Sequence, residues 1–158
     1  MWNRWKPYIV SVAIALGVGA LAAFFTKDSM DIYLSVNQPP LSPPGWVFPV
    51  VWTILYTLMG ISAAMVYEKG IEKGIDTSLA LKIYAVQLVA NFLWSIVFFN
   101  LRWYLFAYIW LMLLWVLIIV MILQFRRVSR LAAYLQIPYL LWVTFASYLN
   151  LMIYILNR

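Results

Sequence analysis

Charged residues divide this chain into five long apolar stretches. Each stretch runs for 19 residues or more without Asp, Glu, Lys or Arg, and other polar residues are rare within it. A helix of about 20 mostly apolar residues crosses a hydrocarbon core of about 30 Å, whereas barrel strands alternate apolar and polar residues. The pattern therefore predicts an all-α membrane protein in which residues 1–158 form one domain of five transmembrane helices. The predicted spans are residues 8–25, 46–67, 79–99, 104–125 and 131–156.

The first apolar stretch has two interpretations. Ser11, Ala15, Gly19 and Ala23 recur at every fourth position, and such small residues let two helices approach closely in lipid. The alternative is a secretory signal peptide, because the start is basic and residues 20–22 (Ala-Leu-Ala) resemble a cleavage site. A stripe of small residues would have no purpose in a discarded peptide, so we favour a first helix that stays in the bundle.

The connection between the first two predicted helices, Thr26–Gly45, is long and rich in proline. Loops of about this length are uncommon in compact domains and often act as lids. Proline fixes φ, which stiffens such a lid, and Pro49 follows in the first turn of the second helix, where a missing N–H costs nothing. Asp28 is expected to cap a short helix around Tyr33.

The charge distribution predicts how the bundle is oriented. The net charge is +6, and eight of the eleven Lys and Arg residues fall on the side of the N-terminus. Only Lys27, Arg102 and Arg158 fall on the other side. Cytoplasmic loops carry the excess of basic residues, so we predict an N-terminus in the cytoplasm and a C-terminus outside. Short basic loops suit lipid headgroups, whereas a nucleic-acid partner would need one clustered basic surface.

The residue types that are missing exclude several kinds of chemistry. The chain has no Cys and no His, and its five acidic residues all lie in predicted loops. A metal site within the membrane would lack ligands, and a nucleophile would lack a base. Proton-coupled transport normally needs an ionisable residue inside the membrane, and none is predicted there. Reactive chemistry must therefore be supplied by a ligand.

Three of the predicted helices carry a stripe that combines tryptophan with small or polar residues. Residues at spacings of three and four share one helix face. One interpretation is packing between helices, with amides hydrogen-bonded across the bundle. The other is a pocket under the long loop, because Trp52 and Trp142 lie well inside their spans and a flat aromatic ligand could stack on them. The stripes are Pro49, Trp52 and Tyr56; Gln87, Asn91 and Trp94; and Pro138, Trp142, Ala146 and Leu149 or Asn150.

Three longer motifs coincide with these stripes. They are "PPGWVFPVVWTILYTLMG" (43–60), "QLVANFLWSIVFF" (87–99) and "PYLLWVTFASYLN" (138–150). Together and in this order they resemble the translocator protein family, also called the TspO or tryptophan-rich sensory protein family. The number of spans and the long first loop agree with that family. The resemblance implies a five-helix bundle, usually a homodimer, and here a bacterial-type member in the cell membrane.

The resemblance also implies a ligand and a site. It implies a pocket closed by the first loop that binds protoporphyrin IX, or isoquinoline- and benzodiazepine-type drugs, with no resident cofactor. It further implies that Trp52 and Trp142 take part in light-dependent oxidative degradation of the porphyrin. Two alternatives remain open, a carrier of porphyrins or lipids and a structural membrane scaffold. Carried over residue by residue, the ligand-binding residues would be Tyr33, Pro43, Trp46, Trp52, Asn91, Trp142 and Ala146.

Overall fold

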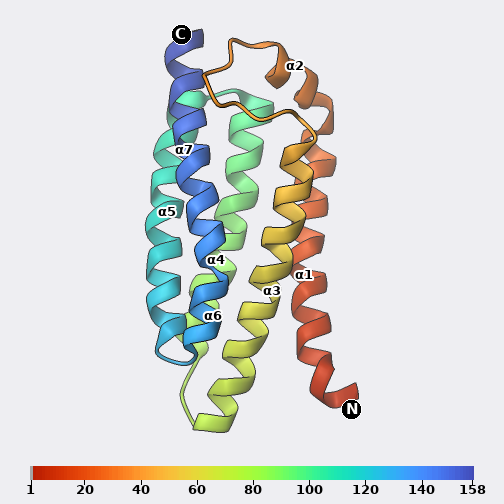
Figure 1. Ribbon diagram of the computed structural model, residues 1–158, viewed down its shortest axis with the longest axis vertical. Helices are drawn as coiled ribbons and strands as arrows, with labels where there is room; N and C mark the ends of the chain where they lie inside the picture. Colours follow the sequence, from red (N-terminus) through yellow and green to blue (C-terminus); the bar gives the residue numbers. More distant parts are fainter. Residues whose placement is uncertain (1) are drawn as a thin grey trace.

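The computed structural model describes residues 2–158, which form a bundle of helices (Figure 1). Five of its helical segments are long and apolar enough to cross a membrane, which confirms the predicted fold class. All five run roughly along the long axis of the molecule (Figure 1). The principal helices are α1 (Trp2–Thr26), α3 (Val47–Lys73), α4 (Ser78–Ser95), α5 (Tyr104–Arg126) and α7 (Ile137–Asn157).

The two ends of the bundle differ in charge. The N-terminus and the α3–α4 and α5–α6 connections lie at one end, while the C-terminus and α2 lie at the other (Figure 1). We call these the basic end and the lid end. Arg4, Lys6, Lys69, Lys73, Lys82, Arg126, Arg127 and Arg130 belong to segments at the basic end, and Lys27, Arg102 and Arg158 to segments at the lid end.

Small residues allow α1 and α3 to pack closely. The Ser11 hydroxyl donates a hydrogen bond of 2.7 Å to the carbonyl of Gly60, and a Cβ added at Gly60 would lie 2.6 Å from the Cα of Val12. Ala15 is completely buried in the same contact region. The predicted stripe fails at its last member. Ala22 is buried and Ala23 is exposed, because each four-residue step rotates about 40° beyond a full helical turn.

The second span is longer than the sequence predicts. Polarity after Tyr67 suggested a connection beginning at Glu68, but α3 continues to Lys73. Glu and Lys are good helix formers, so the helix extends past its apolar segment. It ends at Gly74, whose φ of +66° is the left-handed conformation that commonly terminates helices.

The third and fifth spans are interrupted near one end. The α4 helix passes into a π-helical turn, η2 (Ile96–Leu101), which a pattern of hydrophobic residues does not distinguish from α-helix. The fifth span is divided into α6 (Arg130–Leu135) and α7, with Gln136 between them. The break follows from Pro138, which has no N–H to donate and whose ring crowds the carbonyl four residues earlier.

The long connection forms a lid over one end of the bundle (Figure 1). It consists of η1 (Lys27–Ser29), α2 (Met30–Ser35) and an extended segment up to residue 46. The expected cap is wrong, because Ser29 rather than Asp28 precedes α2 and no side-chain cap forms. The Ser29 hydroxyl instead donates to Oδ1 of Asn100 at 2.6 Å, which ties the lid to η2.

Hydrogen bonds also fasten the lid to α7. The backbone N–H of Asn37 donates to Oδ1 of Asn157 at 3.0 Å, and Nδ2 of Asn157 donates to the carbonyl of Asn37 at 3.0 Å. The Tyr148 hydroxyl donates to the carbonyl of Pro40 at 2.7 Å. These hydrogen bonds are exposed to solvent, whereas the Tyr33 side chain of the lid is buried in the core.

Candidate functional site

An aromatic chamber lies directly under the lid. Side chains from α2, α3, α4, η2 and α7 meet there and leave a void of only about 20 Å³, which is enough for about one water molecule. The chamber is therefore closed and filled by its own walls. Its lining residues are Tyr33, Phe48, Trp52, Trp94, Phe98, Phe99, Trp142, Ala146 and Leu149.

Trp52 and Trp142 form the centre of the chamber wall. Their ring centroids are 6.4 Å apart and the rings are nearly perpendicular, at 89°. Phe48 packs against Trp142 from the lid side, with a centroid distance of 6.0 Å. The indole Nε1 of Trp142 is buried and has no hydrogen-bond partner among the described residues. A buried tryptophan N–H usually has a partner, so this donor is available to a ligand.

Tyr33 of the lid closes the chamber from above. Its ring contacts Phe48, Phe98 and Phe99 with centroid distances of 5.8, 5.6 and 5.2 Å. Nε2 of Gln38 donates to the carbonyl of Tyr33 at 2.6 Å and fixes the end of α2. Outward movement of α2 would withdraw this one ring and open the chamber.

A buried polar network supports the chamber from below. Tyr139 packs against Trp52 with ring centroids 6.3 Å apart. The Tyr139 hydroxyl donates to Oε1 of Gln87 at 2.7 Å and accepts from Nδ2 of Asn91 at 2.9 Å. Beside it, Nε1 of Trp94 donates to Oδ1 of Asn150 at 3.1 Å. These bonds join α4 to α7 and hold the aromatic walls in place.

The structure brings four of the seven residues proposed for ligand binding into the chamber wall: Tyr33, Trp52, Trp142 and Ala146. Asn91 lies outside the wall, in the polar network that supports it. Pro43 and Trp46 do not line the void, and the Trp46 side chain is 68% exposed at the start of α3. That exposure fits an aromatic anchor at the membrane interface.

Five chamber residues were not among the predicted ligand contacts. Trp94 and Leu149 lie on the stripes recognised in the sequence, so their helix face could have identified them. The phenylalanines gave no comparable signal. Two of them lie in the π-helical turn, whose side-chain directions cannot be read from a helical period of 3.6 residues. The phenylalanines are Phe48, Phe98 and Phe99.

An apolar cleft between α3 and α7 lies beside the chamber. Its volume is about 480 Å³, and it is lined by Val51, Ile54, Leu55, Pro138, Leu141, Trp142 and Phe145. Trp142 lines both spaces, so one indole separates the closed chamber from the cleft. Leu141 and Ile54 are 64% and 54% exposed, which places the mouth of the cleft on the outer surface of the bundle.

Comparison with known proteins assigns the chain to a family. The sequence model of the TspO/MBR family matches residues 10–156, which include every residue of the chamber and of the cleft. The chain belongs to the TspO/MBR family. The tryptophan-rich protein TspO of Chlorobaculum tepidum is 40% identical over 147 residues, which are 92% of each chain.

Other TspO/MBR relatives come from distant organisms. The tryptophan-rich protein TspO of Archaeoglobus fulgidus is 37% identical, over 94% of this chain and 95% of its own. The human translocator protein is 32% identical, over 92% of this chain and 87% of its own. With five apolar helices of membrane length, this TspO/MBR chain is an integral, multi-pass membrane protein.

Proposed function

We propose that the aromatic chamber binds protoporphyrin IX and similar flat aromatic molecules and promotes light-dependent oxidative degradation of the porphyrin. The observation that carries this proposal is the pairing of Trp52 and Trp142. The ring centroids of the two indoles are 6.4 Å apart, and the N–H of Trp142 has no hydrogen-bond partner among the described residues. Both indoles lie under the lid. They offer a flat ligand both stacking surfaces and a hydrogen-bond donor.

Binding requires the chamber to open. The void of about 20 Å³ is far smaller than the roughly 300–1,000 Å³ of typical ligand pockets. The simplest way to open the chamber is for α2 to move outward and withdraw the Tyr33 ring. The ring projects from the lid, and the hydrogen bonds between the lid backbone and α7 are few and exposed. The closed form is then the unliganded state, and a ligand stabilises the open one.

The porphyrin supplies the reactivity, and the protein supplies position and protection from water. In the proposed reaction the light-excited porphyrin accepts one electron from a neighbouring indole and passes it to dioxygen, which is the oxidant. The reduced oxygen species then attacks the bound macrocycle, and the oxidised indole is left in the chamber wall. Trp52 and Trp142 are the indoles at the centre of that wall.

The cleft between α3 and α7 favours a carrier as the second candidate function. It opens toward the lipid and reaches the chamber through Trp142, so an apolar ligand could enter from the bilayer instead of from water. A carrier would move porphyrin between vesicles in the dark, whereas a degrading protein would consume it only under light.

We also infer the setting in which the protein works. The excess of basic residues at one end favours a bacterial cell membrane protein with that end in the cytoplasm. Its partners would be membrane lipids and, as in the family resemblance, a second copy of the same chain.

Titration of the purified protein with protoporphyrin IX tests the proposed binding. We expect saturable quenching of tryptophan fluorescence, because Trp52, Trp94 and Trp142 line the chamber. An excess of an isoquinoline-type ligand should restore the emission by competing for the same walls. Quenching that never saturates, or that the competitor leaves unchanged, would contradict binding in the chamber.

A further inference from the structure

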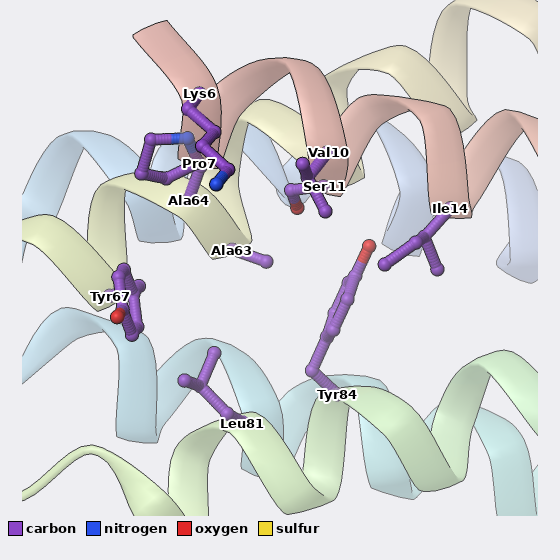
Figure 2. Close-up of a pocket in the computed structure, with 10 residues that line it drawn as sticks. All are labelled: Lys6, Pro7, Val10, Ser11, Ile14, Ala63, Ala64, Tyr67, Leu81 and Tyr84. Carbon is purple, nitrogen blue, oxygen red and sulfur yellow. The ribbon is translucent and has the colours of Figure 1, made fainter. Parts of the chain in front are cut away.

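A third cavity lies far from the chamber, near the basic end of the bundle. It is a groove between α1, α3 and α4 with a volume of about 500 Å³, within the usual range for ligand sites (Figure 2). We call it the basal groove. Its lining residues are Lys6, Pro7, Val10, Ser11, Ile14, Ala63, Ala64, Tyr67, Leu81 and Tyr84.

The basal groove exists because small side chains form its wall on α3. Ala63 and Ala64 present only methyl groups at the level where α1 leaves the close contact at Gly60. Opposite them, Val10 and Ile14 remain about half exposed on α1. The result is an apolar channel along the bundle surface.

One buried polar group faces this apolar space. Tyr84 is only 8% exposed, and its hydroxyl has no hydrogen-bond partner among the described residues. Figure 2 shows the ring projecting from α4 with its hydroxyl directed toward Ser11 and Ile14 of α1. The Ser11 hydroxyl donates to the carbonyl of Gly60 at 2.7 Å and forms no hydrogen bond with Tyr84. A buried hydroxyl without a partner is unfavourable, so the site lacks an acceptor that a ligand could provide.

A cation stands at the same groove. Lys6 lines it from α1, and it forms no ion pair or hydrogen bond with another described residue. By contrast, Lys69 at the same end is paired with Glu72 at 3.5 Å. Basic residues near a membrane surface attract anionic lipids. The positive charge of this end therefore favours an anionic occupant.

The spacing of these groups fits one class of molecule. Ser11, which lies beside the Tyr84 hydroxyl, is five residues after Lys6 and so about 8 Å further along α1. The polar headgroup region of one leaflet is about 5–8 Å thick. A phosphate at Lys6 would therefore place the ester carbonyls of the same lipid near Tyr84.

We propose that the basal groove is a binding site for one anionic phospholipid. The phosphate pairs with the Lys6 ammonium, and an ester carbonyl accepts a hydrogen bond from the Tyr84 hydroxyl. The glycerol backbone lies along Ala63 and Ala64, and an acyl chain continues past Ile14. This site is separate from the aromatic chamber and does not depend on what the chamber binds.

Native mass spectrometry of the full chain with added phosphatidylglycerol or phosphatidylcholine tests the site. Wild type should retain one phosphatidylglycerol in preference to phosphatidylcholine. Lys6→Gln should weaken phosphatidylglycerol binding about tenfold and remove the preference, because it loses a charged hydrogen bond. Tyr84→Phe should weaken both lipids by about two- to tenfold, the effect of one neutral hydrogen bond.

Matched variants make the result decisive. Lys69→Gln removes a charge from the same end, and Tyr134→Phe removes an exposed hydroxyl, so both should bind as wild type does. Ala63→Leu fills the groove and should abolish lipid retention, while quenching of tryptophan fluorescence by porphyrin persists.

Equal retention of the two lipids by wild type, or a loss in Lys69→Gln as large as that in Lys6→Gln, would overturn the proposal. Thermal unfolding of each variant identifies any that is misfolded. Lys6→Arg keeps the charge and should retain the preference for phosphatidylglycerol.

Discussion

At the scale of single residues, the chamber depends on one small side chain among large ones. Ala146 is 7% exposed and lines a wall otherwise made of aromatic rings and Leu149. Ala146 has the smallest side chain of the nine residues that line the void. A ligand that stacks on Trp142 must therefore pass close to Ala146, one turn further along α7.

Ala146→Leu should weaken porphyrin binding about tenfold, or about 1.4 kcal/mol. The added methyl groups occupy the ligand's space, and protein interiors relax only partly to admit extra volume. Fluorescence titration measures the effect. Ala85→Leu, at an exposed position on α4, is the matched control and should bind normally. Equal affinity in Ala146→Leu and wild type would place the ligand elsewhere.

The sequence predicts the residues of the chamber unevenly. Trp52, Trp142 and Ala146 could be predicted because tryptophan deep in a membrane helix is unusual and its helix face follows from spacing. Asn91 lies on the same face of α4 as Trp94, but its amide donates a hydrogen bond to Tyr139 of α7, a helix distant in sequence. Such a pairing depends on tertiary packing, which periodicity does not describe.

At the scale of elements, the close contact of α1 with α3 is the most constrained part of the bundle. A Cβ at Gly60 would lie 2.6 Å from a backbone atom of Val12, and backbone cannot move aside as a flexible side chain can. At Gly17, also in α1, an added Cβ would meet nothing within 4 Å. The two glycines therefore form a natural test pair.

Gly60→Ala should lower stability by about 1–3 kcal/mol, the usual cost of overpacking. Gly17→Ala should leave stability unchanged or raise it by up to about 1 kcal/mol, because alanine favours helix. Thermal unfolding in detergent compares the two variants with wild type. A Gly60→Ala protein as stable as wild type would show that α1 and α3 are not packed this closely.

The proposed binding requires the lid to move. Asn157→Ala removes two exposed hydrogen bonds between α7 and Asn37. At about 0.5 kcal/mol each, the low end of the usual range, their loss should speed porphyrin association about fivefold. Stopped-flow fluorescence measures the rate, with Asn3→Ala at the basic end as control. An unchanged association rate would mean that these bonds do not limit opening.

The sequence predicts the existence of these elements better than their details. Five uncharged stretches identify five spans because only a helix satisfies its own backbone within lipid. The extension of α3 to Lys73 and the break at Gln136 are not visible in hydropathy. They depend on the helix propensity of charged residues and on the backbone geometry imposed by Pro138.

At the scale of the whole molecule, the charge difference between the two ends sets a predicted orientation. Because the chain has no cysteine, single cysteines can report it. Ser35→Cys lies on the lid and Glu72→Cys at the basic end, and both positions are exposed. In intact bacterial cells a membrane-impermeant maleimide should label Ser35→Cys only. Labelling of Glu72→Cys alone would reverse the orientation.

The proposed site is assembled only in the whole bundle. The lid, the aromatic walls and the polar network belong to different helices and meet only in the folded chain. Trp52 and Trp142 are 90 positions apart in the sequence, yet their ring centroids are only 6.4 Å apart. Their motifs favoured a shared pocket, but the sequence alone could not show that they touch.

The proposed function requires that these two indoles act on bound porphyrin. An illumination series tests it directly, following protoporphyrin IX absorbance with wild type, Trp52→Phe, Trp142→Phe and Trp103→Phe. Trp103 is 57% exposed and outside the chamber, so its variant is the control. We predict the same rate of absorbance loss in wild type and Trp103→Phe, and a clearly slower rate in the other two at saturating protein. Equal rates in all four proteins would contradict the proposed role of Trp52 and Trp142.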